Sequence, residues 1–197
     1  MKDEQVNELL YQALETELGG VKVYDAAVRC AVNDDLEKEW QKYLDQTRTH
    51  VRVVTDLLER MGRDPNAETP GRRIVRDKAA ALVRSIETAR SAGDPAGAQL
   101  VAAEAVVDAE TKDHANWELI GELAQKAGGE TAALLKEAHA EVEEEEDEHL
   151  YHTKGWAREL WMESLGLPAV LPPPEEEKHV TTAIGAARAR LARDEMT

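Results

Sequence analysis

The chain has 197 residues, of which 40 are acidic and 24 basic, so its formal net charge is -16 at pH 7. This length suits one domain with a sizeable core, and the charge argues against nucleic acid or an anionic membrane as partner and favours cations. The single cysteine, Cys30, excludes an intramolecular disulfide framework and a cysteine-based zinc site.

The composition predicts an all-helical protein. Ala, Glu and Leu are abundant, Phe is absent, and β-branched residues rarely form runs between turn signals. The first residues lack the apolar core of a secretory signal, and no apolar run approaches the ~20 residues that span a bilayer. We therefore expect a cytoplasmic protein.

The first expected helix covers about residues 3–31, and its inward stripe has the alternating four-three spacing of a bundle helix. Glu17 lies on this otherwise apolar stripe. Gly19 and Gly20 lie beside it in mid-helix, where each costs roughly 1 kcal/mol relative to alanine. Close approach of a neighbouring helix or of a small ligand would explain the glycine pair; a tolerated kink is the alternative.

A second helix is expected over about residues 35–61, after the short connection Asn33-Asp34-Asp35, which also provides a good N-cap. The short connection predicts an antiparallel hairpin with the first helix. His50 interrupts its apolar stripe, although a lone histidine in such a place is more often a hydrogen-bonded core residue than a ligand. A polar turn region then leads to a crossover helix over about residues 72–90.

The third bundle helix is expected over about residues 95–127, with Asp94 as N-cap and Pro95 at its first position. Glu110 and His114 lie on its seam one turn apart, a spacing that lets both contact one ion.

The fourth bundle helix is expected over about residues 131–165 and contains the most acidic stretch of the chain. Seven of the eight positions from 141 to 148 are acidic. Such a run surrounds the helix, so it cannot lie wholly on a solvated face. The apolar stripe continues through Glu145 or Glu146 and then His149, and an uncompensated charge there must be protonated, paired or bound to a cation. The alternative is an acidic surface run.

Residues 1–166 therefore form the expected bundle, and residues 167–197 form a proline-rich linker followed by an amphipathic helix over about residues 180–193. We expect this last helix to dock on the bundle or on another subunit, with a membrane-surface role as a weaker alternative.

Both halves of the bundle repeat one pattern: a glutamate on the first helix of a hairpin and a histidine on the second. Packing the hairpins together brings these side chains to one level. Oxygen and nitrogen ligands without thiolates suit iron or manganese best and zinc next. A polar hydrogen-bonded core layer is the alternative. The predicted metal ligands are Glu17, His50, Glu110, His114, Glu146 and His149.

Three of these motifs carry a resemblance to a known family. Glu17 precedes Tyr24 by seven residues, Glu110 precedes Trp117 by seven, and Glu146 is followed by His149 in a Glu-x-x-His motif. Over about residues 3–165 the chain resembles the ferritin-like superfamily of carboxylate di-metal proteins, which includes rubrerythrins, bacterioferritins and manganese catalases. Residues 44–51 and the helical crossover look like the small bacterial ferritin-like proteins linked to stress responses.

The resemblance implies a four-helix bundle of two antiparallel hairpins that holds two metal ions, usually iron, which react with dioxygen or peroxide. One position departs from the family pattern: Thr47 stands three residues before His50, where a carboxylate is expected. A neutral residue there weakens binding of the more oxidised metal and makes a single metal, zinc, manganese or a vacant site more plausible. His114 is a candidate for compensating this loss.

Two classes of function follow. The leading hypothesis is a non-haem di-iron or manganese redox protein acting on dioxygen, peroxide or Fe(II), in which Tyr24 and Tyr43 either relay electrons or are ordinary core aromatics. The alternative is a non-enzymatic bundle with a degenerate or mononuclear metal site that serves structure, sensing or protein interaction. Whether the protein is an enzyme stays open at this stage. Iron storage in a cage is a weaker third hypothesis, and we expect a homodimer.

Overall fold

A computed structural model of the chain describes residues 2–174, 195 and 196, and within this part it contains helices and no strands, which confirms the all-α prediction. None of the helices described is both long enough and apolar enough to cross a membrane. The helices are α1 Asp3–Val28, α2 Asp34–Arg60, α3 Pro70–Ser91, α4 Pro95–Lys126 and α5 Gly129–Ser164.

Local sequence signals set where the helices begin. The side chains of Asn33, Thr69 and Asp94 each accept a hydrogen bond from a backbone N–H in the first turn of α2, α3 and α4. Pro70 and Pro95 occupy the first turns of α3 and α4, where a missing N–H costs nothing. The N-cap expected at Asp94 is confirmed, and the N-cap expected within residues 33–35 is Asn33. The crossover helix begins two residues before its expected start.

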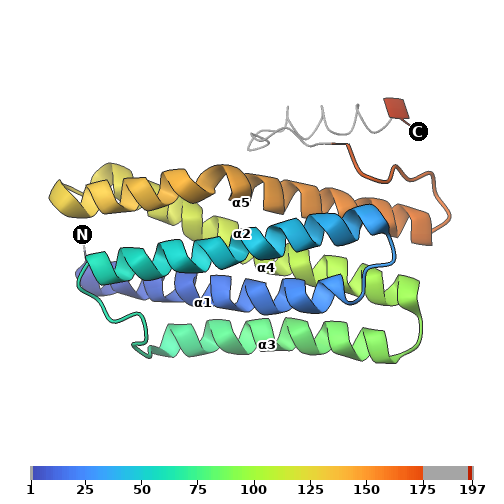
Figure 1. Cartoon of the computed structure of the whole chain (residues 1–197), viewed down its shortest axis with the longest axis horizontal. Coiled ribbons are helices and arrows are strands. Elements are labelled where there is room, and N and C mark those ends of the chain that lie inside the picture. Colours follow the sequence, from blue (N-terminus) through green and yellow to red (C-terminus); the bar gives the residue numbers. More distant parts are fainter. Residues whose placement is uncertain (1, 175–194, 197) are drawn as a thin grey trace.

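The helices run lengthwise beside one another (Figure 1). The hairpin α1–α2 packs against the hairpin α4–α5 through α1 on α4 and α2 on α5. The crossover α3 lies outside this group of four and covers α1 and α4. A Cβ atom at Gly19 would lie 2.6 Å from the Cβ of Ala79, so this glycine allows α3 to approach α1. Close approach of a neighbouring helix was one of the explanations expected for the glycine pair.

Two separate hydrophobic clusters fill the interior. One contains Tyr24, Tyr43 and Trp156, and the other contains Leu14, Trp117 and Val142. Along each of α1, α2, α4 and α5, the buried acids and histidines other than Glu159 fall between the segments that belong to the two clusters. The bundle therefore carries a buried polar layer between two apolar ends. This layer includes Glu17, Thr47, His50, Glu110, Asp113, Glu146 and His149.

A buried ion network ties α3 to α1. Arg72 Nε donates to Glu15 at 2.7 Å and Arg76 Nε donates to the same carboxylate at 2.8 Å. Burial alone would raise the pKa of Glu15, but the hydrogen bonds from Arg76 and Arg72 outweigh it and lower that pKa. Arg72 also donates to the backbone carbonyls of Pro65 and Ala67, which fixes the connection before α3.

The chain after α5 turns back along the bundle instead of leaving it (Figure 1). The backbone N–H of Val170 donates to the fully buried Glu159 at 3.0 Å, and Leu171 packs against the cluster that contains Trp156. The proline-rich segment expected as a linker is thus in contact with the bundle as far as it is described. The amphipathic helix expected over residues 180–193 lies outside the described residues.

Replacing Arg72 with methionine tests the network. The change removes one of the two guanidinium partners of a buried carboxylate, so we expect the free energy of unfolding to fall by about 3 kcal/mol. Arg60→Met is the matched control, because Arg60 pairs with Glu137 where both side chains are more than half exposed, and its loss should cost less than about 1 kcal/mol. Urea denaturation followed by circular dichroism measures both values, and equal losses would contradict the buried role of Arg72.

Candidate metal centre

The polar layer gathers acids and histidines from four helices at one level of the bundle. Glu17 comes from α1, His50 from α2, Glu110 from α4, and Glu146 and His149 from α5. All five side chains are buried, with at most 3% of their surface exposed. The convergence that the sequence predicted for these five residues is therefore present in the fold.

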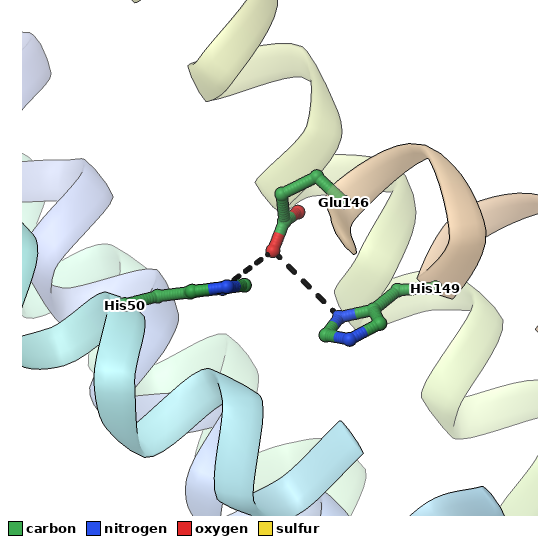
Figure 2. A group of neighbouring side chains, drawn as sticks. All are labelled: His50, Glu146 and His149. Atoms are coloured by element: carbon green, nitrogen blue, oxygen red, sulfur yellow. Dashed lines mark ion pairs between the residues drawn. The ribbon is translucent and has the colours of Figure 1, made fainter. Parts of the chain in front are cut away.

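Glu146 lies between the two histidines (Figure 2). Its Oε1 atom is 2.9 Å from His50 Nδ1 and 3.7 Å from His149 Nδ1. The two imidazole rings lie 5.6 Å apart at an interplanar angle of 29°. One ligand atom from each of these three residues lies within 4.8 Å of the others, a spacing suited to one metal ion.

A second group of three shares the same glutamate. Ligand atoms of Glu17, Asp113 and Glu146 also lie within 4.8 Å of one another. Glu110 borders the first group, with its Oε2 3.7 Å from His149 Nδ1. The arrangement is therefore two neighbouring sets of ligand atoms that meet at Glu146.

Outer side chains orient both histidines. Glu145 Oε2 lies 2.9 Å from His50 Nε2, and Gln46 Oε1 lies 3.0 Å from His149 Nε2. Burial opposes ionisation of Glu145, but hydrogen bonds from His50 and Gln46 outweigh it and lower its pKa. With both outer oxygens accepting, the tautomer that carries its proton on Nε2 leaves the Nδ1 lone pair facing the polar layer, which is the form that binds a metal. Metal-binding histidines in proteins are oriented in this way.

The inward-facing atoms have no hydrogen-bond partner. Although Glu146 Oε1 lies close to His50 Nδ1, this contact lacks the alignment of a hydrogen bond. Buried polar atoms without partners are rare in folded proteins, and several at one place call for an ion, water or proton. The unpartnered atoms are Glu17 Oε2, His50 Nδ1, Glu110 Oε2, Asp113 Oδ1, Glu146 Oε2 and His149 Nδ1.

Burial and mutual repulsion disfavour ionisation of the carboxylates when no cation is bound. Burial raises the pKa of Glu17 well above its usual range, and the charges of Asp113 and Glu146 raise it further. Burial, then Glu146 and Glu110, raise the pKa of Asp113. Burial, with Glu110 next, raises the pKa of Glu146 to about 8. Protons or metal ions must therefore balance this layer at neutral pH.

The structure does not bring His114 to the cluster, which corrects its place among the predicted ligands. Its Nδ1 lies 3.5 Å from Asp147 Oδ1 and its Nε2 lies 3.5 Å from Glu118 Oε1, near the surface between α4 and α5. Residues three and four positions after Glu110 point about 60° and 40° to opposite sides of it. The rotation of α4 in the bundle selects the residue at position three, Asp113, instead of His114.

Asp113 is the buried acid that the sequence reasoning missed. It is 4% exposed and follows Glu110 at the same three-residue spacing that separates Glu146 and His149. That repeated spacing was the available signal.

The position of Thr47 is now clear as well. Its hydroxyl donates to the backbone oxygen of Tyr43 at 2.8 Å, and its methyl group faces Gly20, where an added Cβ would be 3.2 Å away. Thr47 therefore offers no ligand atom to the layer.

The inward acid of the acidic stretch is Glu146, at 2% exposure, whereas the side chain of Glu145 is 38% exposed and acts from outside on His50. Tyr43 and Tyr24 line the layer at one end, with ring centroids 4.2 and 6.1 Å from that of His149. Burial, and next the charge of Glu110, raises the pKa of Tyr24 well above its usual range, so this phenol stays protonated.

The chain matches no protein-family model, no curated protein and no solved structure in the comparisons made. The geometry of the polar layer is therefore the basis for assigning a function.

The metal-free protein should become more stable as the pH falls from about 8 to about 5.5, because the folded chain binds more protons than the unfolded chain wherever a carboxyl pKa is raised. The stability is fully present below the unfolded pKa, near 4.5 for Glu146, and is lost as the pH rises through the folded value of about 8. Melting temperatures of chelator-treated protein across this range measure the effect.

Glu146→Gln should flatten this dependence, whereas Glu143→Gln, which changes an exposed acid on the same helix, should leave it unchanged. Saturating Mn(II) should reverse the slope, because a cation competes with protons for the same oxygens. A melting temperature of metal-free protein that rises with pH would contradict the raised pKa values.

Proposed function

We propose that the polar layer is a dinuclear metal centre and that the protein is a ferritin-like non-haem iron or manganese protein. The unpartnered inward atoms of the layer carry the proposal, since four carboxylates and two imidazoles converge there and one polar atom of each has no hydrogen-bond partner. Charge supports two ions per chain, because Glu17, Glu110, Asp113 and Glu146 together balance two divalent cations. This oxygen-rich set with two imidazoles and no thiolate favours iron or manganese, with zinc next.

In this proposal, each residue has a defined part. Glu146 would contribute to both metal positions, since it belongs to both sets of ligand atoms. His50 and His149 would bind through Nδ1, while Glu145 and Gln46 hold their outer nitrogens. Trp117 donates to Glu17 Oε1 at 2.8 Å, which leaves Oε2 of that carboxylate for the metal. The arrangement of two hairpins with a crossover helix supports the ferritin-like resemblance, and two apolar clusters exclude bulk water from the layer.

When bound, iron or manganese supplies electrons for reduction of dioxygen or peroxide, and Fe(II) is itself the substrate of a ferroxidase. The chain contributes a dry cavity, fixed ligand positions and a phenol, Tyr24, that faces Glu110. A role of Tyr24 or Tyr43 in electron transfer, a homodimeric state and a link to stress responses stay predictions.

One observation favours a second candidate, a metal site that serves structure or sensing without turnover. Thr47 uses its hydroxyl on the backbone, so α2 contributes a histidine and no carboxylate. Dioxygen and peroxide consumption by the metal-loaded protein discriminates the two: tight metal binding without consumption supports the second candidate.

Anaerobic calorimetric titration with Fe(II), Mn(II) and Zn(II), with elemental analysis, should give two ions per chain. At 100 times the dissociation constant, each bound ion should add about 2.7 kcal/mol to the free energy of unfolding, so two independent ions should add about 5.4 kcal/mol. Glu146→Gln should remove tight binding at both positions, because that carboxylate is shared. His114→Ala is the matched control and should retain both ions, since His114 lies outside the cluster. Failure of the unmodified protein to bind any of the three metals would contradict the proposal.

Replacing Asp113 with asparagine should reduce the stoichiometry from two ions to one. The group of His50, Glu146 and His149 stays intact in this variant, whereas the group that contains Glu17 loses a charged ligand. Asp108→Asn, an exposed aspartate on the same helix, should leave two ions. If the Asp113 variant binds two ions with unchanged affinity, this residue is not a ligand.

A further inference from the structure

A cavity of about 390 Å³ lies on the opposite side of α1 from α2, between α1, α3 and α4. This volume falls within the range of small-molecule sites in proteins. Its walls come from one face of each helix, and Gly19 and Gly20 form part of the α1 wall. At Gly19 this wall is in close contact with α3, since an added Cβ would lie 2.6 Å from the Cβ of Ala79.

Two lysines line this cavity, Lys112 half-buried and Lys78 exposed. Among the residues that the structure describes, neither amine has a carboxylate within ion-pair distance, and Lys112 Nζ donates to the neutral side chain of Asn116. In a chain with net charge -16, two lysines without a carboxylate partner form a local site for an anion.

The remaining wall is largely apolar. Val23 comes from α1, Val75 and Leu82 from α3, and Ala109 from α4. Asp108 lies on the exposed rim one turn before Lys112. Lys112 lies near Thr16, since Asn116 hydrogen-bonds to both, whereas Val23 and Leu82 follow Thr16 and Lys78 along α1 and α3. The cavity therefore combines two amines with apolar wall, the complement of an amphiphilic anion.

A thin polar wall separates this cavity from the carboxylate cluster. Lys112 Nζ donates to Asn116 Oδ1, and Asn116 Nδ2 donates to Thr16 Oγ1 at 3.0 Å. Thr16 directly precedes Glu17 on α1, and Lys112 directly precedes Asp113 on α4. Each of these two helices therefore presents one face to the cavity and the neighbouring face to the carboxylate cluster. A molecule in the cavity would lie beside the acids of α1 and α4 and away from the histidines of α2 and α5.

We propose that this cavity binds a medium-chain aliphatic carboxylate, with its carboxylate on Lys78 and Lys112 and its chain along Val23, Leu82 and Ala109. The inference goes beyond the metal centre and does not require it. A fatty acid of this kind satisfies the unpaired amines and removes apolar wall from water at the same time.

Calorimetric titration of the metal-free protein with sodium octanoate tests this proposal. The unmodified protein should bind one octanoate per chain, and the double variant Lys78→Gln/Lys112→Gln should bind at least about tenfold more weakly, since charge-assisted contacts are lost. Lys38→Gln removes a lysine that is exposed on α2 and pairs with Asp35, so it should leave the affinity unchanged. Octanol and octylammonium, which have the same chain without the negative charge, should also bind at least about tenfold more weakly.

A second variant tests the cavity itself. Ala81 is exposed on α3 at the rim, so Ala81→Trp should block the opening without disturbing the core and should weaken octanoate binding, with circular dichroism confirming the fold. The proposal is overturned if octanoate does not bind, if the lysine variant or Ala81→Trp binds it as tightly as the unmodified protein, or if octylammonium binds equally well. Because no metal is present, these results are independent of the metal stoichiometry.

Discussion

Repulsion among four buried carboxylates is the constraint on which the rest of the structure depends. Glu17, Glu110, Asp113 and Glu146 occupy one level of a dry bundle, where ionised acids without counter-charge are costly. Burial and the neighbouring charges both raise the pKa values of Glu17, Asp113 and Glu146. Protons can neutralise this layer, but they leave the Nδ1 atoms of the histidines without a partner. Two divalent cations, as proposed, would satisfy the acids and the imidazoles together.

The packing around the layer holds these groups in place. The apolar clusters on both sides of the layer pack the four bundle helices together. Three partners outside the layer orient inward side chains: Gln46 orients His149, Glu145 orients His50 and Trp117 orients Glu17. The absence of a carboxylate at Thr47 is accompanied by the presence of one at Asp113. Four acids therefore face the layer, with none from α2 and two from α4. Their total charge accounts for this combination better than the identity of any single position.

The two sides of the layer have different surroundings. On the side of α2 and α5, Glu145 and Gln46 hydrogen-bond to the outer nitrogens of the histidines. On the side of α1 and α4, a cavity beneath the crossover helix α3 lies next to Thr16 and Lys112. The proposed anion site thus lies beside the carboxylate side of the layer.

The sequence by itself determined the helices, the places of two N-caps and four of the six buried acids and histidines at the layer, because apolar periodicity and capping depend on residues close in the chain. It also showed that a carboxylate is missing at Thr47. Tertiary structure alone decided between Asp113 and His114 and between Glu145 and Glu146, since residues three and four positions apart lie near the same helical face and only the rotation of each helix against its neighbours selects one. The cavity beneath α3 likewise depends on three helices distant in sequence, and no local pattern encodes their mutual approach.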